Sequence, residues 1–155
     1  MDIIFKKRTG QKHIISYKRE GREDFWMEAD AFFVLHDLSH YAIETTLKYT
    51  TAFWGLIKEG INPDVFENKE LRDKLSLTNE AWYAECMANL FLMELSQGVF
   101  ENLYNVINDS LRQTNPEVPA IELSSDEIEN IRKTFTALVS KWKSLNTDET
   151  ILLTF

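Results

Sequence analysis

The residues best suited to chemistry lie in one short segment, 35–44, which reads LHDLSHYAIE. His36 and His40, two of the three histidines in the chain, occur here four residues apart. Positions i and i+4 lie on the same face of an α-helix, so both imidazoles can point at one ion, as in zinc-binding helices. The spacing therefore permits a divalent metal such as zinc, although these donors also suit iron, nickel or manganese.

A third metal ligand has to come from another element. Glu44 lies eight residues after His36, about 12 Å further along a helix, which is too far for both of them and His40 to share one ion easily. Glu85 and Asn89 lie one helical turn apart in an otherwise apolar segment, where polar groups need partners. We expect Glu85 to be the third ligand and Asn89 to be a supporting polar residue, with both facing the histidines.

Asp37 directly follows the first histidine, at the position where zinc proteases carry a general-base glutamate. Aspartate is one methylene shorter and reaches a metal-bound water less readily, so the protease interpretation is weak. Asp37 and Glu44 are candidates for a catalytic base or for the hydrogen bond that orients a metal-binding histidine. Asp37 can also be a helix-start charge or a solvent-facing residue.

Two other interpretations of these residues stay open. The histidines and carboxylates can form a closed, buried network that fixes the packing of two helices in a non-enzymatic structural or protein-interaction module. A histidine can also act in acid–base catalysis without a metal. A metal site requires access for solvent and an open coordination position, which a closed network lacks.

Aromatic residues close to the polar segments are candidates for the wall of a pocket, although such residues are more often part of a core. The four candidates are Phe53, Trp54, Trp82 and Tyr83. Other chemistries have little support. The glycines are isolated and form no phosphate-binding loop, and Cys86 lies in an apolar segment where nothing indicates an activated nucleophile.

The elements that position these residues begin with β-structure. Segments 3–8 and 13–19 are rich in β-branched and aromatic residues and are joined by a short connection with a glycine, which predicts a β-hairpin. A turn at 20–22 leads to residues 24–27, which either add a strand or cross to the first helix. Residues 150–155 are short and apolar, and we expect them to form a strand that pairs with the hairpin.

Helical periodicity dominates the middle of the chain. The first helix is expected to begin between residues 30 and 35 and to end near residue 49. The second spans 52–58 and stops at Gly60, and a short third helix runs from 63 to about 74.

The apolar segment 80–97 is expected to be the central helix, with its N-cap at Thr78 or Asn79. Gly98 then breaks or kinks this helix, and helical spacing continues over residues 100–111. The last helix begins with a capping box formed by Ser124 and Glu127.

These patterns predict an α+β fold that is mostly α, with the N-terminal hairpin and the C-terminal strand packed on a bundle of about four to five helices. The chain has 155 residues, with only 5 glycines and 3 prolines. We therefore expect one domain over 1–155, with a hairpin region at 1–29, a helical body at 30–146 and the strand at 150–155.

The net charge of −8 is unevenly distributed. Residues 1–22 contain seven Lys or Arg and two Asp or Glu, whereas the remainder contains 10 and 23. The basic residues are expected to solvate and protect a hairpin edge. The acidic remainder argues against nucleic acid as a partner.

The cellular setting is also constrained by composition. The single Cys86 excludes an intramolecular disulfide and fits a reducing, cytoplasmic location. The sequence lacks an export signal and an apolar run of membrane-spanning length, so we expect no membrane partner. The last helix and the exposed hairpin edge each allow a homo-oligomer.

The run His36-Asp37-Leu38-Ser39-His40 with Glu44, followed by Phe53-Trp54-Gly55 and Gly60, resembles a family of small bacterial proteins without an established function. Those proteins have a basic β-hairpin, a His-Asp-Leu-x-His helix start ending in Val-Glu, a Phe-Trp-Gly segment and a short C-terminal strand. Here Ile43 replaces the usual valine, and Leu35 stands where proline is frequent. The resemblance implies a bacterial source and a shared architecture, and it supplies no activity.

Overall fold

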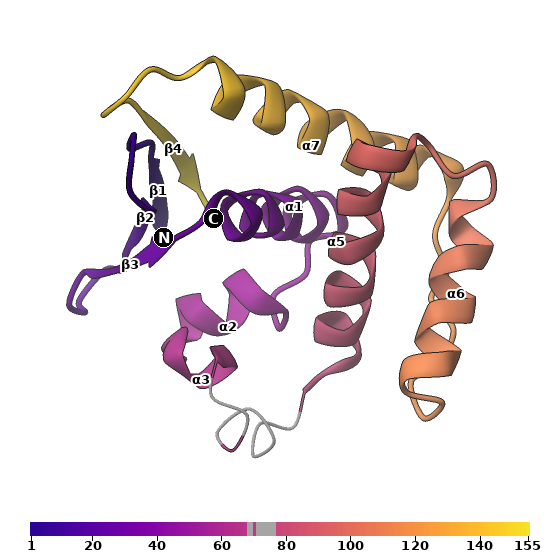
Figure 1. The fold of residues 1–155 in the computed structure, drawn as a ribbon. Helices are drawn as coiled ribbons and strands as arrows, with labels where there is room; N and C mark the ends of the chain where they lie inside the picture. The colour runs from indigo at the N-terminus through magenta and orange to yellow at the C-terminus, as the bar shows by residue number, and fades with distance from the viewer. Residues whose placement is uncertain (68–69, 71–76) are drawn as a thin grey trace.

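The computed structural model describes residues 1–67, 70 and 77–155. Within this part of the chain, a four-stranded antiparallel sheet lies at one end of the molecule and helices form the rest (Figure 1). The fold is α+β and mostly α, which confirms the predicted class.

The sheet joins both ends of the chain, because its strand order is β3-β2-β1-β4. Its strands are β1 (Asp2–Lys6), β2 (His13–Lys18), β3 (Phe25–Ala29) and β4 (Thr150–Thr154). Phe5 pairs with Ile15 on one side and with Ile151 on the other. The predicted hairpin and the pairing of the C-terminal strand are confirmed, and the segment after the second turn forms a strand.

Alternate residues of the strands are buried, as expected for a sheet that packs on helices with one face. These residues are Ile3, Phe5, Ile15, Tyr17, Ala29 and Ile151. They join the buried side chains of the helices in one hydrophobic core.

The helices are α1 (Ala31–Leu47), α2 (Phe53–Glu59), α3 (Asp64–Glu67), α5 (Asn79–Gln97), α6 (Leu103–Thr114) and α7 (Ser125–Ser144). Most of the predicted extension of the short third helix to residue 74 lies outside the described residues. None of the helices in the described part of the chain is long and apolar enough to cross a membrane.

Local capping explains several of these boundaries. The Asp30 side chain accepts hydrogen bonds from the first turn of α1, and Thr78 caps α5. Ser124 and Glu127 form the predicted capping box of α7. Gly60 ends α2 with φ of 118°, a left-handed conformation that favours glycine.

The expectation that segment 80–97 is the central helix is wrong, because α1 has that position. α1 contacts α2, α5, α7 and the strands β2 and β3, and in Figure 1 it lies between α7, α5 and α2. α5 leaves Met93 and Leu95 exposed near its C-terminal end. The polar residues of α1 are therefore placed against several elements at once.

Candidate metal centre

His36, His40 and Glu44 form a row along one face of α1, one residue per turn. The exposed fraction of their side chains falls along this row from 16% at His36 to 3% at His40 and 0% at Glu44. The row therefore runs from the surface into the core, and its two histidines lie at different depths.

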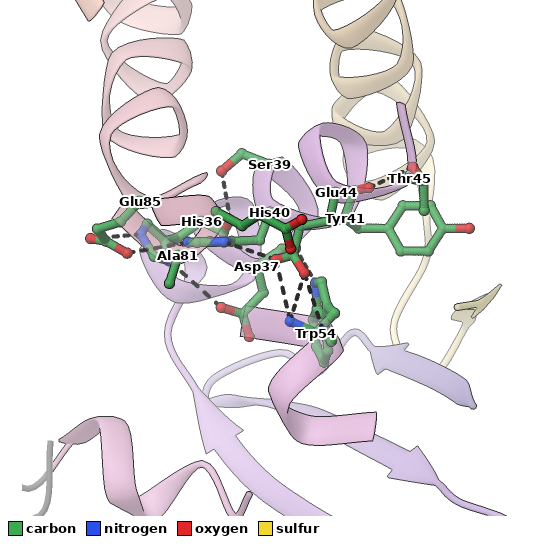
Figure 2. Close-up of polar contacts among 12 residues, drawn as sticks. His36, Asp37, Ser39, His40, Tyr41, Glu44, Thr45, Trp54, Ala81 and Glu85 are labelled. Atoms are coloured by element: carbon green, nitrogen blue, oxygen red, sulfur yellow. Dashed lines mark hydrogen bonds and ion pairs between the residues drawn. The ribbon is translucent and has the colours of Figure 1, made fainter. Parts of the chain in front are cut away.

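Glu85 reaches this row from α5 (Figure 2). Its Oε1 atom lies 3.6 Å from Nε2 of His36, and its Oε2 atom lies 3.2 Å from Nε2 of His40. One ligand atom from each of the three residues lies within 4.8 Å of the other two. The structure thus brings together the three residues that the sequence analysis selected as metal ligands.

Asn89 supports Glu85 rather than the histidines. Its amide nitrogen donates to Oε1 of Glu85 at 3.0 Å and to the main-chain oxygen of the same residue at 2.9 Å. The expectation that Asn89 itself faces the imidazoles is wrong, because its side chain folds back one turn along α5. It fixes the orientation of the carboxylate between the two rings.

The Nδ1 atoms of both histidines face other carboxylates. Nδ1 of His40 lies 3.2 Å from Oε1 of Glu44, and Nδ1 of His36 lies 3.7 Å from Oδ1 of Asp37. Asp37 and Glu44 are both buried. Each imidazole therefore has one nitrogen directed at Glu85 and the other directed at a buried carboxylate.

Glu44 also binds the start of α2. Its carboxylate accepts hydrogen bonds from the backbone N–H of Trp54 at 2.9 Å and of Gly55 at 3.2 Å. A Cβ atom on Gly55 would lie 2.1 Å from the main-chain oxygen of Thr50, so only glycine allows this close approach. The close approach to Thr50 explains the glycine of the Phe-Trp-Gly segment. The hydrogen bonds of Glu44 were not predicted, because backbone N–H donors have no residue-type signature.

The aromatic wall candidates have different positions. The Phe53 ring lies 5.1 Å from the His40 ring, measured between centroids. Trp54 is buried and its indole N–H donates to the main-chain oxygen of Asp37 at 3.1 Å, so it supports α1 from the core rather than lining a pocket.

The other two wall candidates belong to α5. Trp82 is half-buried against the core. The Tyr83 hydroxyl donates to the main-chain oxygen of Pro119, between α6 and α7. Phe32 is a further aromatic neighbour that was not among the candidates, and its ring lies 6.1 Å from that of His36 with an interplanar angle of 23°. Its position four residues before His36 is the signal that identifies it.

Comparisons with protein-family models, with curated proteins and with solved structures find no match to this chain.

The electrostatics of the cluster favour protonated histidines in the metal-free protein. Burial acts to lower the pKa of His40, but hydrogen bonds to Glu44 and Glu85 outweigh it and raise this pKa to about 9. The pKa of His36 is also raised, because Asp37 and Glu85 outweigh the effect of burial. The two imidazolium groups then balance part of the carboxylate charge.

The pKa values of Glu85 and Asp37 are shifted in opposite directions. Burial acts to raise the pKa of Glu85, but hydrogen bonds from both histidines hold it well below its usual range. For Asp37, burial dominates and raises the pKa, although His36 offsets part of this effect. Glu85 is thus the ionised group that the two histidines share.

The donor set suits a divalent transition metal. Zinc binds imidazole nitrogen and carboxylate oxygen at about 2.0–2.2 Å, which places tetrahedral ligands roughly 3.3–3.5 Å apart. In the structure Oε1 of Glu85 lies 3.6 Å from His36 and Oε2 lies 3.2 Å from His40, and one ligand atom from each residue lies within 4.8 Å of the other two, so binding of an ion needs a contraction of the cluster of about 1 Å. Within the described residues, this is the group of histidine, cysteine and acidic side chains that meets the spacing for a metal ion.

Proposed function

We propose that this protein binds one divalent metal ion, with zinc as the first candidate, through His36, His40 and Glu85, and that it uses the ion in hydrolysis. The observation that carries the proposal is the matched orientation of the two histidines. Each directs Nε2 at Glu85 and Nδ1 at a buried carboxylate, with Nδ1 of His40 within hydrogen-bond distance of Glu44 and Nδ1 of His36 3.7 Å from Asp37. Metal-binding histidines in proteins characteristically have such a partner on the second nitrogen, because it fixes the tautomer and the ring orientation.

Two imidazoles and one carboxylate are also the protein ligands of a class of zinc hydrolases, which leave the fourth position to water or substrate. An ion held in this way supplies a water of lowered pKa and polarises a carbonyl group. Asp37 and Glu44 are better suited to orienting histidines than to acting as a base, because both are buried and engaged with the imidazoles.

Access to the cluster supports a metal site over a closed packing network. The inner members of the cluster are buried, but the Glu85 side chain is 54% exposed and the His36 side chain keeps contact with solvent. A network whose role is only to fix helix packing gains little from an exposed carboxylate. The exposed side is where an exchangeable ligand can reach the ion.

We propose a bacterial source and a cytoplasmic location for this function. The family resemblance implies a bacterial source, and the single Cys86 fits the reducing cytoplasm. The acidic composition disfavours nucleic acid as a partner. These points remain predictions, as does the single-domain organisation.

Metal content is the direct test. Tag-free protein is incubated with zinc, manganese or iron(II), dialysed, and analysed by inductively coupled plasma mass spectrometry. We expect close to one ion per chain, with zinc retained best. The His13→Ala variant is the matched control, because His13 lies in the hairpin and its ring contacts Trp142.

The ligand variants are His36→Ala and Glu85→Gln, which change the more exposed side of the cluster and spare the buried His40. Both should lose the ion and retain a cooperative thermal unfolding transition. Wild-type protein that retains no ion from any of the three solutions would overturn the proposal. So would full metal content in both ligand variants.

A further inference from the structure

The row of residues on α1 extends one turn beyond His36 to Phe32. Phe32 is 56% exposed, so the row begins at an exposed aromatic ring, passes through the two histidines and ends at the buried Glu44. Buried groups close the inner end of the cluster. The solvent-exposed members of the cluster are His36 and Glu85, so a ligand reaches the candidate ion from the outer end of the row, where Phe32 lies beside His36.

An apolar surface lies at this entrance. The Phe32 ring is nearly parallel to that of His36, and Phe33 lies against Phe32 with 5.5 Å between ring centroids. Phe33 is 52% exposed. Two adjacent exposed phenyl rings offer a flat apolar surface, and stacking of a flat apolar group on it removes part of this surface from water.

The charge of the cluster restricts the polar part of such a ligand. Asp37, Glu44 and Glu85 bring three carboxyl groups to the cluster, and the ion pairs of these groups in the described structure are with His36 and His40. These carboxyl groups already surround both histidines, and further negative charge beside them is disfavoured, so phosphate esters and other multiply charged anions fit this site poorly.

We infer that the substrate is an uncharged amide or ester with a flat apolar group bonded to its carbonyl, and that this group stacks on Phe32. The inference rests on the proposed metal site. Hydrolysis consumes one water: its oxygen bonds to the carbonyl carbon, the bond from that carbon to the leaving nitrogen or oxygen breaks, and a water proton passes to the leaving atom. The reaction needs no oxidant or reductant.

Hydroxamates test this inference, because they bind metals through a carbonyl group and differ in the group attached to it. Binding of benzohydroxamate, acetohydroxamate and phenylphosphonate to the zinc-loaded protein is measured by isothermal titration calorimetry. We expect the Kd of benzohydroxamate to be at least about tenfold lower than those of the other two, which corresponds to about 1.4 kcal/mol.

Phe32→Ala should remove most of the preference for benzohydroxamate while zinc content and acetohydroxamate affinity stay unchanged. Trp26→Ala is the matched control, because Trp26 is an exposed aromatic residue on β3, outside the row, and its loss should change neither affinity.

Several results would overturn the inference and spare the metal proposal: equal affinities for the two hydroxamates, tighter binding of phenylphosphonate, or an unchanged preference in Phe32→Ala. A dimer in light scattering that becomes a monomer in Phe32→Ala would also overturn it, because the two phenyl rings would then form an interface between copies. Absence of bound zinc would instead overturn the proposed function itself.

Discussion

The carboxylate of Glu44, which has no solvent exposure, lies 3.2 Å from Nδ1 of His40. The same carboxylate accepts the backbone N–H groups of Trp54 and Gly55. A single buried side chain therefore orients a candidate metal ligand and anchors the start of α2, and its replacement should affect both.

We predict that Glu44→Gln lowers the free energy of unfolding by about 1–3 kcal/mol, because the amide replaces one acceptor oxygen with a donor that faces other donors. Zinc affinity should fall roughly 10- to 100-fold, as for other partners of metal-binding histidines. Urea unfolding and competitive zinc titration measure the two effects.

Glu80→Gln is the matched control for this variant. The Glu80 carboxylate also accepts two backbone N–H groups, from Thr50 at 3.0 Å and Thr51 at 2.7 Å, but these contacts are exposed. Its change should leave zinc affinity as in the wild type. Equal losses of zinc affinity in both variants would argue against a specific role for Glu44.

We predict that Gly55→Ala destabilises the protein by about 1–3 kcal/mol, because the added methyl group overlaps the main chain at Thr50. The start of α2 must then move away from Glu44, so zinc affinity should also fall. Urea unfolding measures the change in stability, and competitive zinc titration measures the change in zinc affinity. An unfolding midpoint equal to that of the wild type would mean that α2 shifts without cost.

The stability of the metal-free protein should depend on pH. His40 has a folded pKa of about 9, above its ordinary value of 6.5, so the stability from its bound proton is fully present below pH 6.5 and is lost as the pH rises through 9. Glu85 has a lowered pKa, so its contribution is present above pH 4.5 and is lost on acidification.

Thermal unfolding from pH 4 to 10 should therefore show a maximum near pH 5–6.5 for the metal-free wild type. In Glu85→Gln the decline above pH 6.5 should be smaller, because one of the carboxylates that raise the pKa of His40 is neutral. A melting temperature that rises steadily to pH 10 would contradict the proton-binding state assigned to the histidines.

Cys86 should react slowly with iodoacetamide in the folded protein. Burial, with a further contribution from the Glu85 charge, raises the pKa of its thiol to about 11. The thiolate fraction at pH 8 is then roughly a hundredth of that of an ordinary cysteine. Mass spectrometry should show slow alkylation in buffer and rapid alkylation in urea, whereas equal rates would show that the thiol is accessible and unperturbed.

The sequence was most informative where a local rule applies. The four-residue spacing of His36 and His40 predicted a shared face, and the isolated polar character of Glu85 on an apolar helix predicted its partners. Capping boxes and glycine stops depend on neighbouring residues only, so the ends of α2 and the start of α7 could also be predicted.

It was harder to predict which helix is most buried, because the buried face of α1 carries several polar residues. α1 buries Asp37, Ser39, His40 and Glu44, so its sequence resembles that of a half-exposed helix although it occupies the centre. α5 carries apolar residues such as Leu95 that stay exposed, so its sequence overstates its burial. Contacts of Glu44 with backbone N–H groups leave no trace in residue types.

Helix α2 has only seven residues, too few for stable helix formation in isolation. Glu44 is bound at its N-terminal end, and at its C-terminal end Arg19 donates to the main-chain oxygen of Ile57 and Arg22 to that of Glu59. The Glu44 anion lies at the positive, N-terminal end of the helix dipole, and the two arginine cations lie at its negative, C-terminal end. The turn between β2 and β3 therefore holds α2 in place, α2 in turn holds Glu44, and Glu44 orients His40. The arrangement of the histidine cluster thus depends on a sheet that supplies none of its ligands.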